Sequence, residues 1–535
     1  MKKFSAILIS ALMAVVTVGS LGCDNKNKTP DNIVADKYKI TVACQTEMGE
    51  EEVLNVLKKA YEAKHTDVEV EIKTFSGEGF EQYMLGIAAD QSSSPNIIWT
   101  ADTYHSQWDQ YFVDLRPYYE SSEETDYENY YETMLDTAST NGRFKPTKNY
   151  TGSFRSDDLD VNSDGYENYA NQSEYGLYYA PRDYNKPALL CNTYLFAELD
   201  KAYERVYKEK ESASEMPDGY VSATARLNAI VNGDDWDEFG DLFVFAKSVA
   251  ERIAYVVNET KDGNTARTWN NRAVMNLFLE WEPTYTTVMN ELGVGLIAAD
   301  GSLNIEQYKS AFESLHTQMF PGGSAAEEQV AGFMLTTSSG IQFSSGNLFM
   351  TVCSRPVVFG FGNTFKGTYG DASLEAIRFP VENIAAGNSG YAISNIWEGK
   401  GMTVGGVYKS YTELSWDFIK FIITKEGQEA AGATGLNIPV LKKLYSSETN
   451  GGVEPAWRKV ESLSGMSNDA WVAGGELAQN AYNVFVPAKR NTFRTILRTF
   501  FTNLQKTNYN DGSLDKLIEN TLKNYRNQNP AASLR

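Results

Sequence analysis

The stretch Tyr38-Lys39-Ile40-Thr41-Val42-Ala43-Cys44 begins the pattern that decides the fold. Its apolar residues alternate with polar or small ones, as in a β-strand, and strand-like runs recur at residues 68–72 and 96–99. Between these runs, apolar residues recur at helical spacing over residues 53–61 and 80–88. Strand, helix, strand, helix, strand is typical of a parallel α/β sheet. We therefore predict an α/β fold that begins at residue 38.

Further along the chain, this regular pattern stops and then returns. Residues 117–176 are rich in Tyr, Asn, Ser, Asp and Glu and have little periodicity, which predicts an insertion of loops and short helices. Helix-like stretches dominate from Trp236 to about Phe320, and residues 348–352 alternate like a strand. Apolar residues line one face of residues 493–504, so we expect the chain to end in helices.

The first 23 residues have the order of a secretory signal. Lys2 and Lys3 precede an apolar run, Ile7 to Val18, that is too short to span a membrane as a helix. The small residue before Cys23 resembles the bacterial lipobox, in which the cysteine receives a diacyl lipid and becomes the new N-terminus. Ser20 departs from that motif, which prefers a larger aliphatic residue there. Ordinary secretion without a lipid is therefore the alternative.

We expect residues 1–22 to be a removed signal peptide and residues 23–37 to be a lipidated tether that begins at Cys23. Two acyl chains are about what stable membrane attachment needs. No later segment offers 18 consecutive apolar residues, so the lipid anchor alone is expected to hold the protein to the membrane. The expected location is the extracellular face of the cytoplasmic membrane.

Composition narrows the class of partner. The net charge is −22, which argues against nucleic acid or anionic lipid as a binding partner because both would be repelled. Aromatic residues make up 13% of the chain, enough to line a ligand groove as well as to fill cores. Such surfaces suit neutral, ring-shaped ligands.

Cysteine and histidine usage argues against a disulfide framework and against zinc chemistry. Of the four cysteines, Cys44, Cys191 and Cys353 remain once Cys23 is assigned to the lipid, and an odd number cannot all pair. We expect buried free thiols, with one disulfide and a leftover thiol as the alternative. The three histidines form no HExxH motif and there is no CxxC motif, so a zinc enzyme is not expected.

Several short stretches, taken in order, resemble one family. The match begins in residues 40–70 and continues in Ala88-Ala89-Asp90 with Ser94-Pro95-Asn96-Ile97-Ile98-Trp99, then in residues 184–196 and Trp236-Asp237-Glu238-Phe239. Its strongest part is Leu414-Ser415-Trp416-Asp417-Phe418-Ile419-Lys420-Phe421-Ile422, followed by residues 424–428 and 434–440. These stretches are similar to those of the extracellular solute-binding proteins of ABC importers, the maltose-binding-protein-like family that includes many oligosaccharide-binding lipoproteins. Each motif is weak, but their order holds over most of residues 38–505, apart from the insertion.

The resemblance implies a type II periplasmic-binding-protein fold with two α/β lobes, a hinge and a ligand cleft. It implies lobe one in residues 38–180, lobe two in 181–369, a second part of lobe one in 370–432, and lobe two with the C-terminal helices in 433–535. The implied function is capture of a sugar, most simply an oligosaccharide, and delivery to the permease subunits of an ABC transporter by a monomer. Hinge closure around the ligand is the usual mode for such proteins.

Candidate ligand-binding residues are sought first at strand ends, where α/β proteins bind ligands. Four candidates lie at or after the end of a predicted strand, two lie in the turn before residues 184–191, one follows an apolar helix, and three lie in the glycine-rich stretch before residues 402–405. Aromatic faces would stack on sugar rings, and planar polar groups would bond the hydroxyls. The candidates are Trp99, Asp102, Tyr104, Arg182, Asp183, Trp281, Arg355, Tyr391, Trp397 and Glu398. Each has a plain structural alternative: Trp99 closes an apolar strand and suits a core, Asp102 and Tyr104 suit a loop, and Arg355 suits a hinge salt bridge.

One motif points to a metal. Residues 160–166, Asp-Val-Asn-Ser-Asp-Gly-Tyr, match the first half of a calcium-binding loop, with Asp160, Asn162, Asp164 and Tyr166 at ligand positions. Position twelve is Asn171 rather than the bidentate Glu, and no flanking helices are evident. Structural calcium and an ordinary turn are both open interpretations, and no cofactor is expected to be required for binding.

The competing class is an enzyme, a lipid-anchored glycoside hydrolase. Its two carboxylates would be Glu280 with Glu282, or Asp157 with Asp158. Groups so close in sequence rarely lie on the two sides of a scissile bond. We therefore expect a binding protein and not an enzyme; release of reducing sugar would reveal a hydrolase.

Overall fold

The computed structural model of the chain describes residues 36–528 except for internal gaps. The longer gaps are residues 119–177, 294–304 and 320–338. The shorter ones are 47–48, 102–107, 116, 234–235, 280, 356, 359–364, 366, 370–373, 437, 461, 464–465, 468–470, 473–479, 484–489, 505–506 and 509–510. Cys23, the expected signal peptide, nearly all of the expected tether and most of the expected insertion lie outside the described residues.

A five-stranded sheet forms the first half of the molecule. Its strand order is β2 (Val68–Phe75), β1 (Tyr38–Gln45), β3 (Ile97–Ala101), β11 (Ser389–Ile393) and β4 (Ala180–Pro181). Strands β1, β2 and β3 are parallel, as the sequence predicts, whereas β11 runs antiparallel to both β3 and β4. The sheet therefore takes its last two strands from distant parts of the chain.

Helices cover this sheet and bury its apolar side chains. They are α1 (Glu50–Glu62), α2 (Gly77–Ala89), α14 (Tyr411–Ile423) and α15 (Lys425–Gly432). The expected strand–helix alternation of residues 38–99 is thus confirmed. Helix α14 starts at a capping box, in which Ser410 and Glu413 satisfy each other's backbone N–H groups. Shorter elements complete this half: η2 (Gln91–Ser93), η4 (Asp109–Tyr111), β5 (Asp183–Tyr184), η6 (Asn395–Trp397), β12 (Gly401–Val404), β13 (Val407–Ser410), β14 (Ile438–Pro439), η7 (Lys442–Leu444) and η8 (Ala456–Lys459).

A four-stranded sheet forms the second half. Its order is β7 (Ala273–Asn276), β8 (Leu348–Cys353), β6 (Ala188–Asn192) and β9 (Leu374–Ile377), with β7 parallel to β8, and with β6 antiparallel to β8 and to β9. The helices of this half are α6 (Thr193–Glu211), α7 (Ala223–Val231), α8 (Phe239–Glu259), α9 (Gly263–Asn270), α10 (Glu282–Glu291), α11 (Ile305–Met319), α12 (Ser339–Ser344), α17 (Arg490–Leu504) and α18 (Ser513–Gln528). Two short pairs, β10 (Asn383–Ala386) with β17 (Asn480–Asn483) and β15 (Ser462–Leu463) with β16 (Met466–Ser467), complete the described elements.

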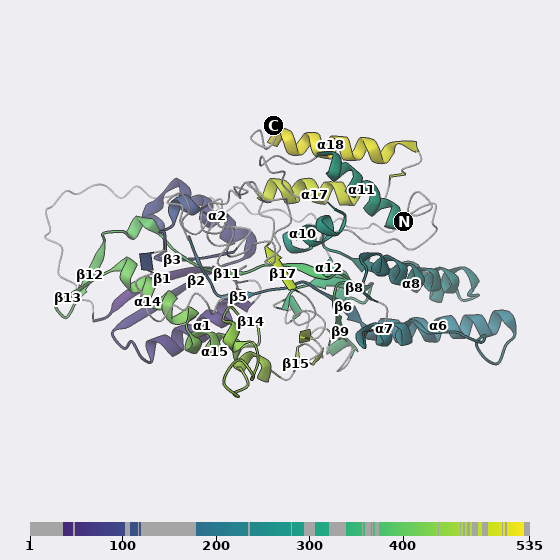
Figure 1. Cartoon of the computed structure of the whole chain (residues 1–535), viewed down its shortest axis with the longest axis horizontal. Helices are drawn as coiled ribbons and strands as arrows, with labels where there is room; N and C mark the ends of the chain where they lie inside the picture. The colour runs from purple at the N-terminus through teal and green to yellow at the C-terminus, as the bar shows by residue number, and fades with distance from the viewer. Residues whose placement is uncertain are drawn as a thin grey trace, which may run out of the picture.

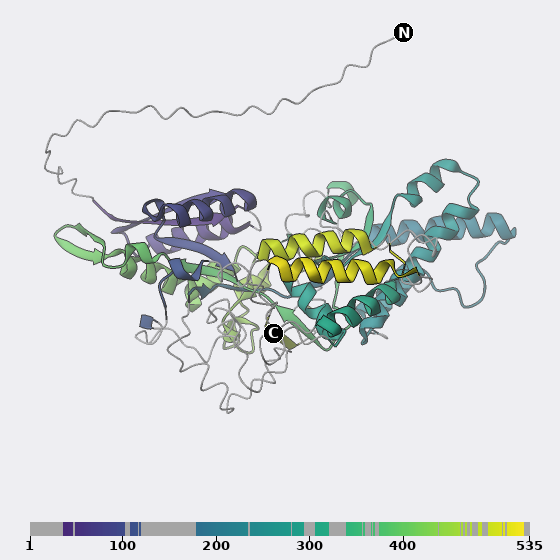
Figure 2. The ribbon, with the colours of Figure 1, turned by 90° about the horizontal axis from the view of Figure 1, so that it is seen from above.

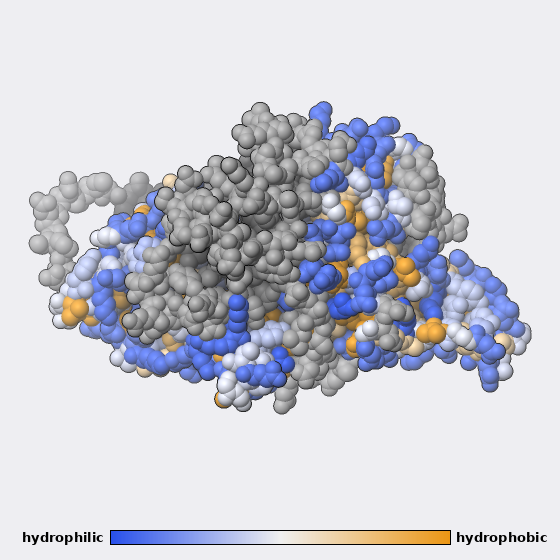
Figure 3. All heavy atoms as spheres, viewed as in Figure 1, coloured by the Kyte–Doolittle hydropathy of each residue, from blue (hydrophilic) through white to orange (hydrophobic). Residues whose placement is uncertain are grey.

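The two halves lie side by side along the long axis of the molecule (Figures 1 and 2). Helices α17 and α18 run next to each other on the second half. They are the helices that the sequence predicts near the C-terminus. On the face shown in Figure 3, hydrophilic residues cover most of the described surface. No described helix is both long enough and apolar enough to cross a membrane.

Two of the chain segments that cross between the halves are paired with each other. Asn185 lies between β5 and β6, and Gly387 lies between β10 and β11. The Asn185 N–H donates to the Gly387 carbonyl at 2.9 Å, and the Gly387 N–H donates back to the Asn185 carbonyl at 2.8 Å. This reciprocal pair joins the crossing segments into one short antiparallel ribbon, so they are constrained to move together.

The structure places two lobe boundaries differently from the expected ones. The chain was expected to return to the first lobe at residue 370, but β9 pairs with β6 in the second sheet, so the return follows β9. Residues 433–535 were assigned to the second lobe, yet Leu436, Ile438 and Trp457 belong to the core of the first half. Apolar runs show that a strand is buried but not which sheet it joins, and that is the reason for both differences.

The expected free thiols are confirmed. Cys44, Cys191 and Cys353 are all buried and unpaired by disulfides. Burial raises the pKa of each thiol above its usual value, which keeps it protonated. The alternative of one disulfide with a leftover thiol is not what the structure shows.

His316 makes the stability of the second half sensitive to acid. It is fully buried in α11, its Nε2 lies 3.1 Å from the Thr507 carbonyl, and burial lowers its pKa below 6.5. The unfolded chain gains a proton as the pH falls through about 6.5, while the folded protein resists it, so the free energy of unfolding falls. Each unit between the two pKa values is worth about 1.4 kcal/mol.

We expect His316→Gln to lose this component of acid sensitivity. Urea unfolding of both proteins at pH 7.5 and pH 5.5 measures it. The wild type should lose more stability between the two pH values than the variant does. Equal losses in the two proteins would contradict the role of His316.

Candidate ligand-binding site

The carboxyl ends of the three parallel strands meet at one edge of the first sheet. Strand β1 ends at Gln45, β2 at Phe75 and β3 at Ala101, and Ser389 at the start of β11 lies opposite Ala101. Helix α1 begins at the same edge, directly after the loop that follows β1. Open α/β sheets bind ligands outside the carboxyl ends of their strands. This edge is therefore the first half of the candidate site.

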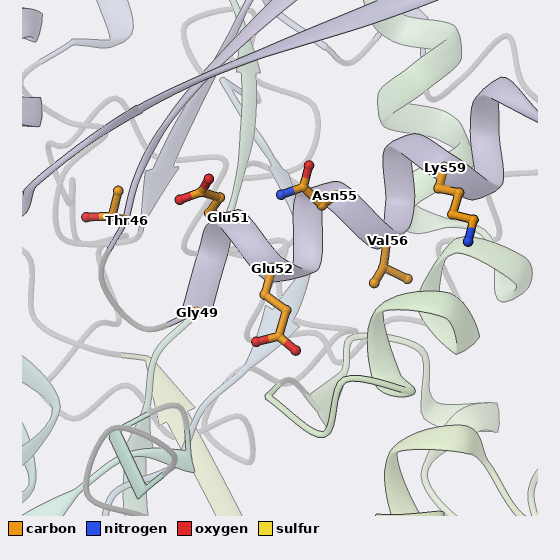
Figure 4. Close-up of a pocket in the computed structure, with 7 residues that line it drawn as sticks. All are labelled: Thr46, Gly49, Glu51, Glu52, Asn55, Val56 and Lys59. Atoms are coloured by element: carbon orange, nitrogen blue, oxygen red, sulfur yellow. The ribbon is translucent and has the colours of Figure 1, made fainter. Parts of the chain in front are cut away.

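A hollow of about 640 Å³ opens at this edge, within the range of ligand sites. Figure 4 shows its lining along the first turns of α1, beside the residue that follows β1: Thr46, Gly49, Glu51, Glu52, Asn55, Val56 and Lys59. Most of these side chains are hydroxyl, carboxylate, amide or ammonium groups, which bond well to ligand hydroxyls. None of these residues was singled out from the sequence.

Gly49 shapes the entrance to α1. Its φ of 72° is left-handed, and a Cβ placed there would lie 2.5 Å from a methyl carbon of Leu436. The left-handed conformation therefore favours glycine, and a larger residue would also displace the end of the Leu436 side chain. Gly49 turns the chain from the end of β1 into α1, where the three successive carboxylates of residues 50–52 begin the helix.

The second sheet contributes an aromatic pair at the carboxyl end of β7. Buried Asn276 ends the strand, and its Oδ1 accepts the Phe278 N–H at 2.6 Å. The Trp281 N–H donates to the Phe278 carbonyl at 3.0 Å. The rings of Phe278 and Trp281 are stacked, with centroids 6.1 Å apart, and both side chains are half-buried. Trp281 was a predicted site residue, whereas nothing in the sequence singled out Phe278.

Phe278 has a strained backbone. Its φ is +50°, and among the described residues Ser212 is the other non-glycine residue with positive φ. Ser212 ends helix α6, where a left-handed residue is common. For a bulky side chain the same conformation is unfavourable by about 1–3 kcal/mol, and such residues cluster at ligand sites. The turn after β7 therefore holds an aromatic residue where glycine would be easier.

Arg355 shows that this edge of the second sheet faces the first half. It lies two residues after the end of β8, its Nε donates to the Gly435 carbonyl at 2.5 Å, and its Nη2 donates to the Trp457 carbonyl at 3.3 Å. Trp457 belongs to the core of the first half. Arg355 is 1% exposed, so the expectation that it bonds a ligand differs from the structure. It joins the halves, as the hinge alternative predicts, although these bonds go to carbonyls and not to a carboxylate.

Comparison with known proteins assigns the family. A family model described as bacterial extracellular solute-binding protein matches residues 57–454. The chain is a bacterial extracellular solute-binding protein. The expected membership is thus confirmed, and with it the expectation of a binding protein and not an enzyme, because this family binds solutes. None of the curated protein sequences matches the chain.

Solved structures share the fold of this solute-binding protein. The GacH receptor of Streptomyces glaucescens is 13% identical, with a TM-score of 0.54 over 92% of this chain and 98% of the receptor. An ABC substrate-binding protein of Listeria monocytogenes is 12% identical, with a TM-score of 0.56 over 92% and 99% of the two chains. The sugar-binding protein MalE of Xanthomonas citri is 12% identical, with a TM-score of 0.54 over 93% and 100%. These matches confirm the predicted type II periplasmic-binding-protein fold.

Three predicted site residues lie inside the solute-binding protein. Arg182, Asp183 and Tyr391 are at most 2% exposed. The Arg182 Nη2 donates to Glu50 Oε2 at 2.6 Å and to Asp183 Oδ2 at 3.2 Å, and the Tyr391 hydroxyl donates to the other Glu50 oxygen. Asp183 also accepts the Ser389 hydroxyl at 2.8 Å. These three residues were expected to face the cleft. In the structure they instead bond to one another and to Glu50 in the interior.

Electrostatics hold that network together. Burial raises the pKa of the Glu50 carboxyl, while Arg182 and Tyr391 act in the opposite direction. Burial disfavours the charged guanidinium as well, but Glu50, Tyr391 and Asp183 together outweigh this and raise the pKa of Arg182. The network joins the start of α1, the first crossing segment and β11, so it fixes the first half around the hinge.

Trp99 is also in the core. It is 4% exposed, its ring packs edge-on against Phe80 with centroids 5.7 Å apart, and it lies opposite Tyr391 in the sheet. The core interpretation of this residue is the one the structure favours. The sequence shows that Trp99 is near a strand end but not which face of the sheet it occupies.

Trp397 and Glu398 lie at the wrong end of the sheet for the cleft. Because β11 is antiparallel to β3, its last residue, Ile393, lies opposite Ile97 at the amino end of β3. The Trp397 indole donates to the carbonyls of Ser94 and Pro95, each at 3.1 Å. Both predicted ligand contacts are therefore corrected: strand direction places them away from the carboxyl ends.

The remaining expectations concern residues outside the described part of the chain. Asp102 and Tyr104 are among them, as are Asp160, Asn162, Asp164 and Tyr166 of the calcium-like loop. Within the described residues, no three His, Cys, Asp or Glu side chains gather as a metal site. Asp102, Tyr104 and the calcium loop stay predictions.

Proposed function

We propose that the protein captures a sugar, most simply an oligosaccharide, between its two halves and delivers it unaltered to an ABC transporter permease. The observation that supports this proposal is that each half has a suitable surface at the carboxyl ends of its sheet strands. A hollow whose lining includes hydroxyl, carboxylate, amide and ammonium side chains lies at the carboxyl ends of β1–β3, and a stacked aromatic pair lies at the carboxyl end of β7. Sugars need both surfaces, since their hydroxyls bond polar groups and their C–H faces stack on rings.

Family and fold support a sugar over other solutes. The Streptomyces receptor was solved with acarbose and the Listeria protein with cycloalternan, and the Xanthomonas protein is named as sugar-binding. In this proposal the paired crossing segments form a hinge, and closure brings the aromatic pair of the second lobe over the hollow of the first. Neither lobe alone would then enclose the ligand.

We also propose that Cys23 carries a diacyl anchor on the extracellular face of the cytoplasmic membrane, and that the protein acts there as a monomer. Mass spectrometry of the membrane-extracted protein would detect the lipid on Cys23. Cys23→Ser should release the protein into the medium.

Calorimetry combined with solution scattering tests the function. The mature chain with Cys23→Ser is titrated with oligosaccharides of increasing length, and scattering is recorded with and without each ligand. We expect saturable binding of at least one oligosaccharide, a decrease in radius of gyration on binding, and no release of reducing ends. Binding of a short peptide in preference to every sugar, or hydrolysis of the sugar, would refute the proposal.

A further inference from the structure

The hairpin of β12 and β13 projects from one end of the molecule (Figures 1 and 2). Its strands pair antiparallel from Gly401 with Ser410 to Val404 with Val407. Gly405 and Gly406 form the two-residue turn with φ values of 56° and 85°. Two left-handed residues match the twist of a tight hairpin, so the tip is a well-formed structure.

The tip exposes apolar side chains. Val407 is 58% exposed and the adjacent Tyr408 is 57% exposed. Figure 3 shows hydrophobic residues at this end of the molecule. Neither side chain belongs to the buried cores of the described residues.

Aromatic rings and lysines surround the base of the hairpin. The half-buried Trp397 ring packs against Tyr411 with centroids 4.9 Å apart, and the Lys400 Nζ lies 5.5 Å from the Trp397 ring centre. Tyr, Trp and Lys are the residues enriched where proteins meet the membrane–water interface, because each combines an apolar body with a polar end.

Ion pairs offset acidic charge at this end of the molecule. Lys409 pairs with Asp67 at 3.1 Å, and Lys39 lies 3.4 Å from Glu71 and 3.7 Å from Glu69. The hairpin therefore approaches an anionic surface with less repulsion than the net charge of −22 implies.

The hairpin lies beside the start of the folded chain. The Tyr38 hydroxyl, on the first residue of β1, donates to the Val407 carbonyl at 2.7 Å, and the Lys409 Nζ lies 4.5 Å from the Tyr38 ring centre. Cys23 precedes Tyr38 by 15 residues. Even a fully extended chain of that length spans only about 50 Å, so an anchored Cys23 keeps this end of the molecule close to the bilayer.

We propose that the tip of the β12–β13 hairpin rests in the interfacial layer of the membrane that holds the lipid of Cys23. The inference rests on the proposed anchoring of Cys23. Contact through Val407 and Tyr408 gives the anchored protein a second attachment point and so restricts its orientation. The contact is apolar and aromatic, and it therefore depends only weakly on salt and on anionic lipid.

The test uses the lipidated full chain in vesicles of phosphatidylcholine, and in the same vesicles with added phosphatidylglycerol. Val407→Cys carries an environment-sensitive fluorophore, and nitroxide-labelled lipid quenches it. Val453→Cys is the matched control, because Val453 is equally exposed at 57% and lies outside the hairpin. The buried native thiols, whose pKa values are raised, do not compete for the label.

We expect quenching at residue 407 to exceed that at residue 453 by about threefold or more in both lipid mixtures, and Tyr408→Ser to reduce the excess. Flotation of the vesicles reports anchoring separately. Protein that floats but is quenched equally at both positions overturns the hairpin contact alone. Protein that fails to float overturns the anchoring and the contact together. Protection of residue 407 only when a second protein is added would assign the tip to a protein partner and overturn the proposal.

Discussion

Replacing Arg182 by Met is expected to lower the free energy of unfolding by about 3–5 kcal/mol, because it leaves buried carboxyl groups without their cation. Glu50 and Asp183 both accept hydrogen bonds from this guanidinium, and both are at least 96% buried. Breaking one partner of a buried pair is far more costly than removing the whole pair. Adding Glu50→Gln to the Arg182 variant should therefore recover part of the loss.

Urea unfolding measures this effect, and Lys201→Met provides a matched control. Lys201 pairs with Glu198 at 2.8 Å, but its side chain is 74% exposed. An exposed pair contributes about 0–1 kcal/mol, so the control should be nearly as stable as the wild type. If the Arg182 variant were no less stable than this control, the network would not hold the first half together.

Replacing Phe278 by Gly is expected to weaken ligand binding by about 10- to 100-fold, or about 1.4–2.8 kcal/mol, while leaving overall stability nearly unchanged. The ring is half of the proposed stacking platform, so its loss weakens binding. Glycine adopts the left-handed conformation at position 278 without strain, which offsets the packing lost with the ring. Trp281→Ala should weaken binding to a similar extent.

Ser212→Gly is the control for the backbone effect. It relieves the same kind of conformation, at the end of α6, without removing a ring from the proposed site. We expect its stability to be equal or higher and its affinity for the sugar to be unchanged, both measured by calorimetry. Unaltered affinity in the Phe278 variant, or a loss of several kcal/mol of stability, would show that Phe278 is a core residue.

Local patterns predicted the local structure well. The alternation in residues 38–44 and 68–72 and the helical spacing in residues 53–61 and 80–88 became β1, β2, α1 and α2. These elements depend on periods of two and 3.6 residues, which a single sequence displays directly. The family resemblance could likewise be recognised from the sequence, because it depends only on the order of the matching stretches along the chain.

The site could not be predicted to the same extent because it depends on long-range direction and pairing. Trp397 seemed a good platform until the antiparallel direction of β11 placed it at the far edge. The Arg182 network assembles residues 50, 182, 389 and 391 from three distant segments, which no spacing reveals. Trp281 was predicted as a site residue from its residue type and stays a prediction. The left-handed turn that places Phe278 beside it has no signal in the sequence.

The insertion of β11 next to β3 also determines when the chain is able to fold. Ser94 and Ser394, which bond at 2.7 Å beside these two strands, are 300 residues apart. Until β11 has been synthesised and exported, β3 is an open strand edge with apolar side chains, and such edges associate with other chains. Contacts between distant segments also form slowly. A nascent chain that ends before residue 389 should therefore aggregate. Export of the intact protein should depend on keeping the unfolded chain from associating with other chains until its last third has been synthesised and exported.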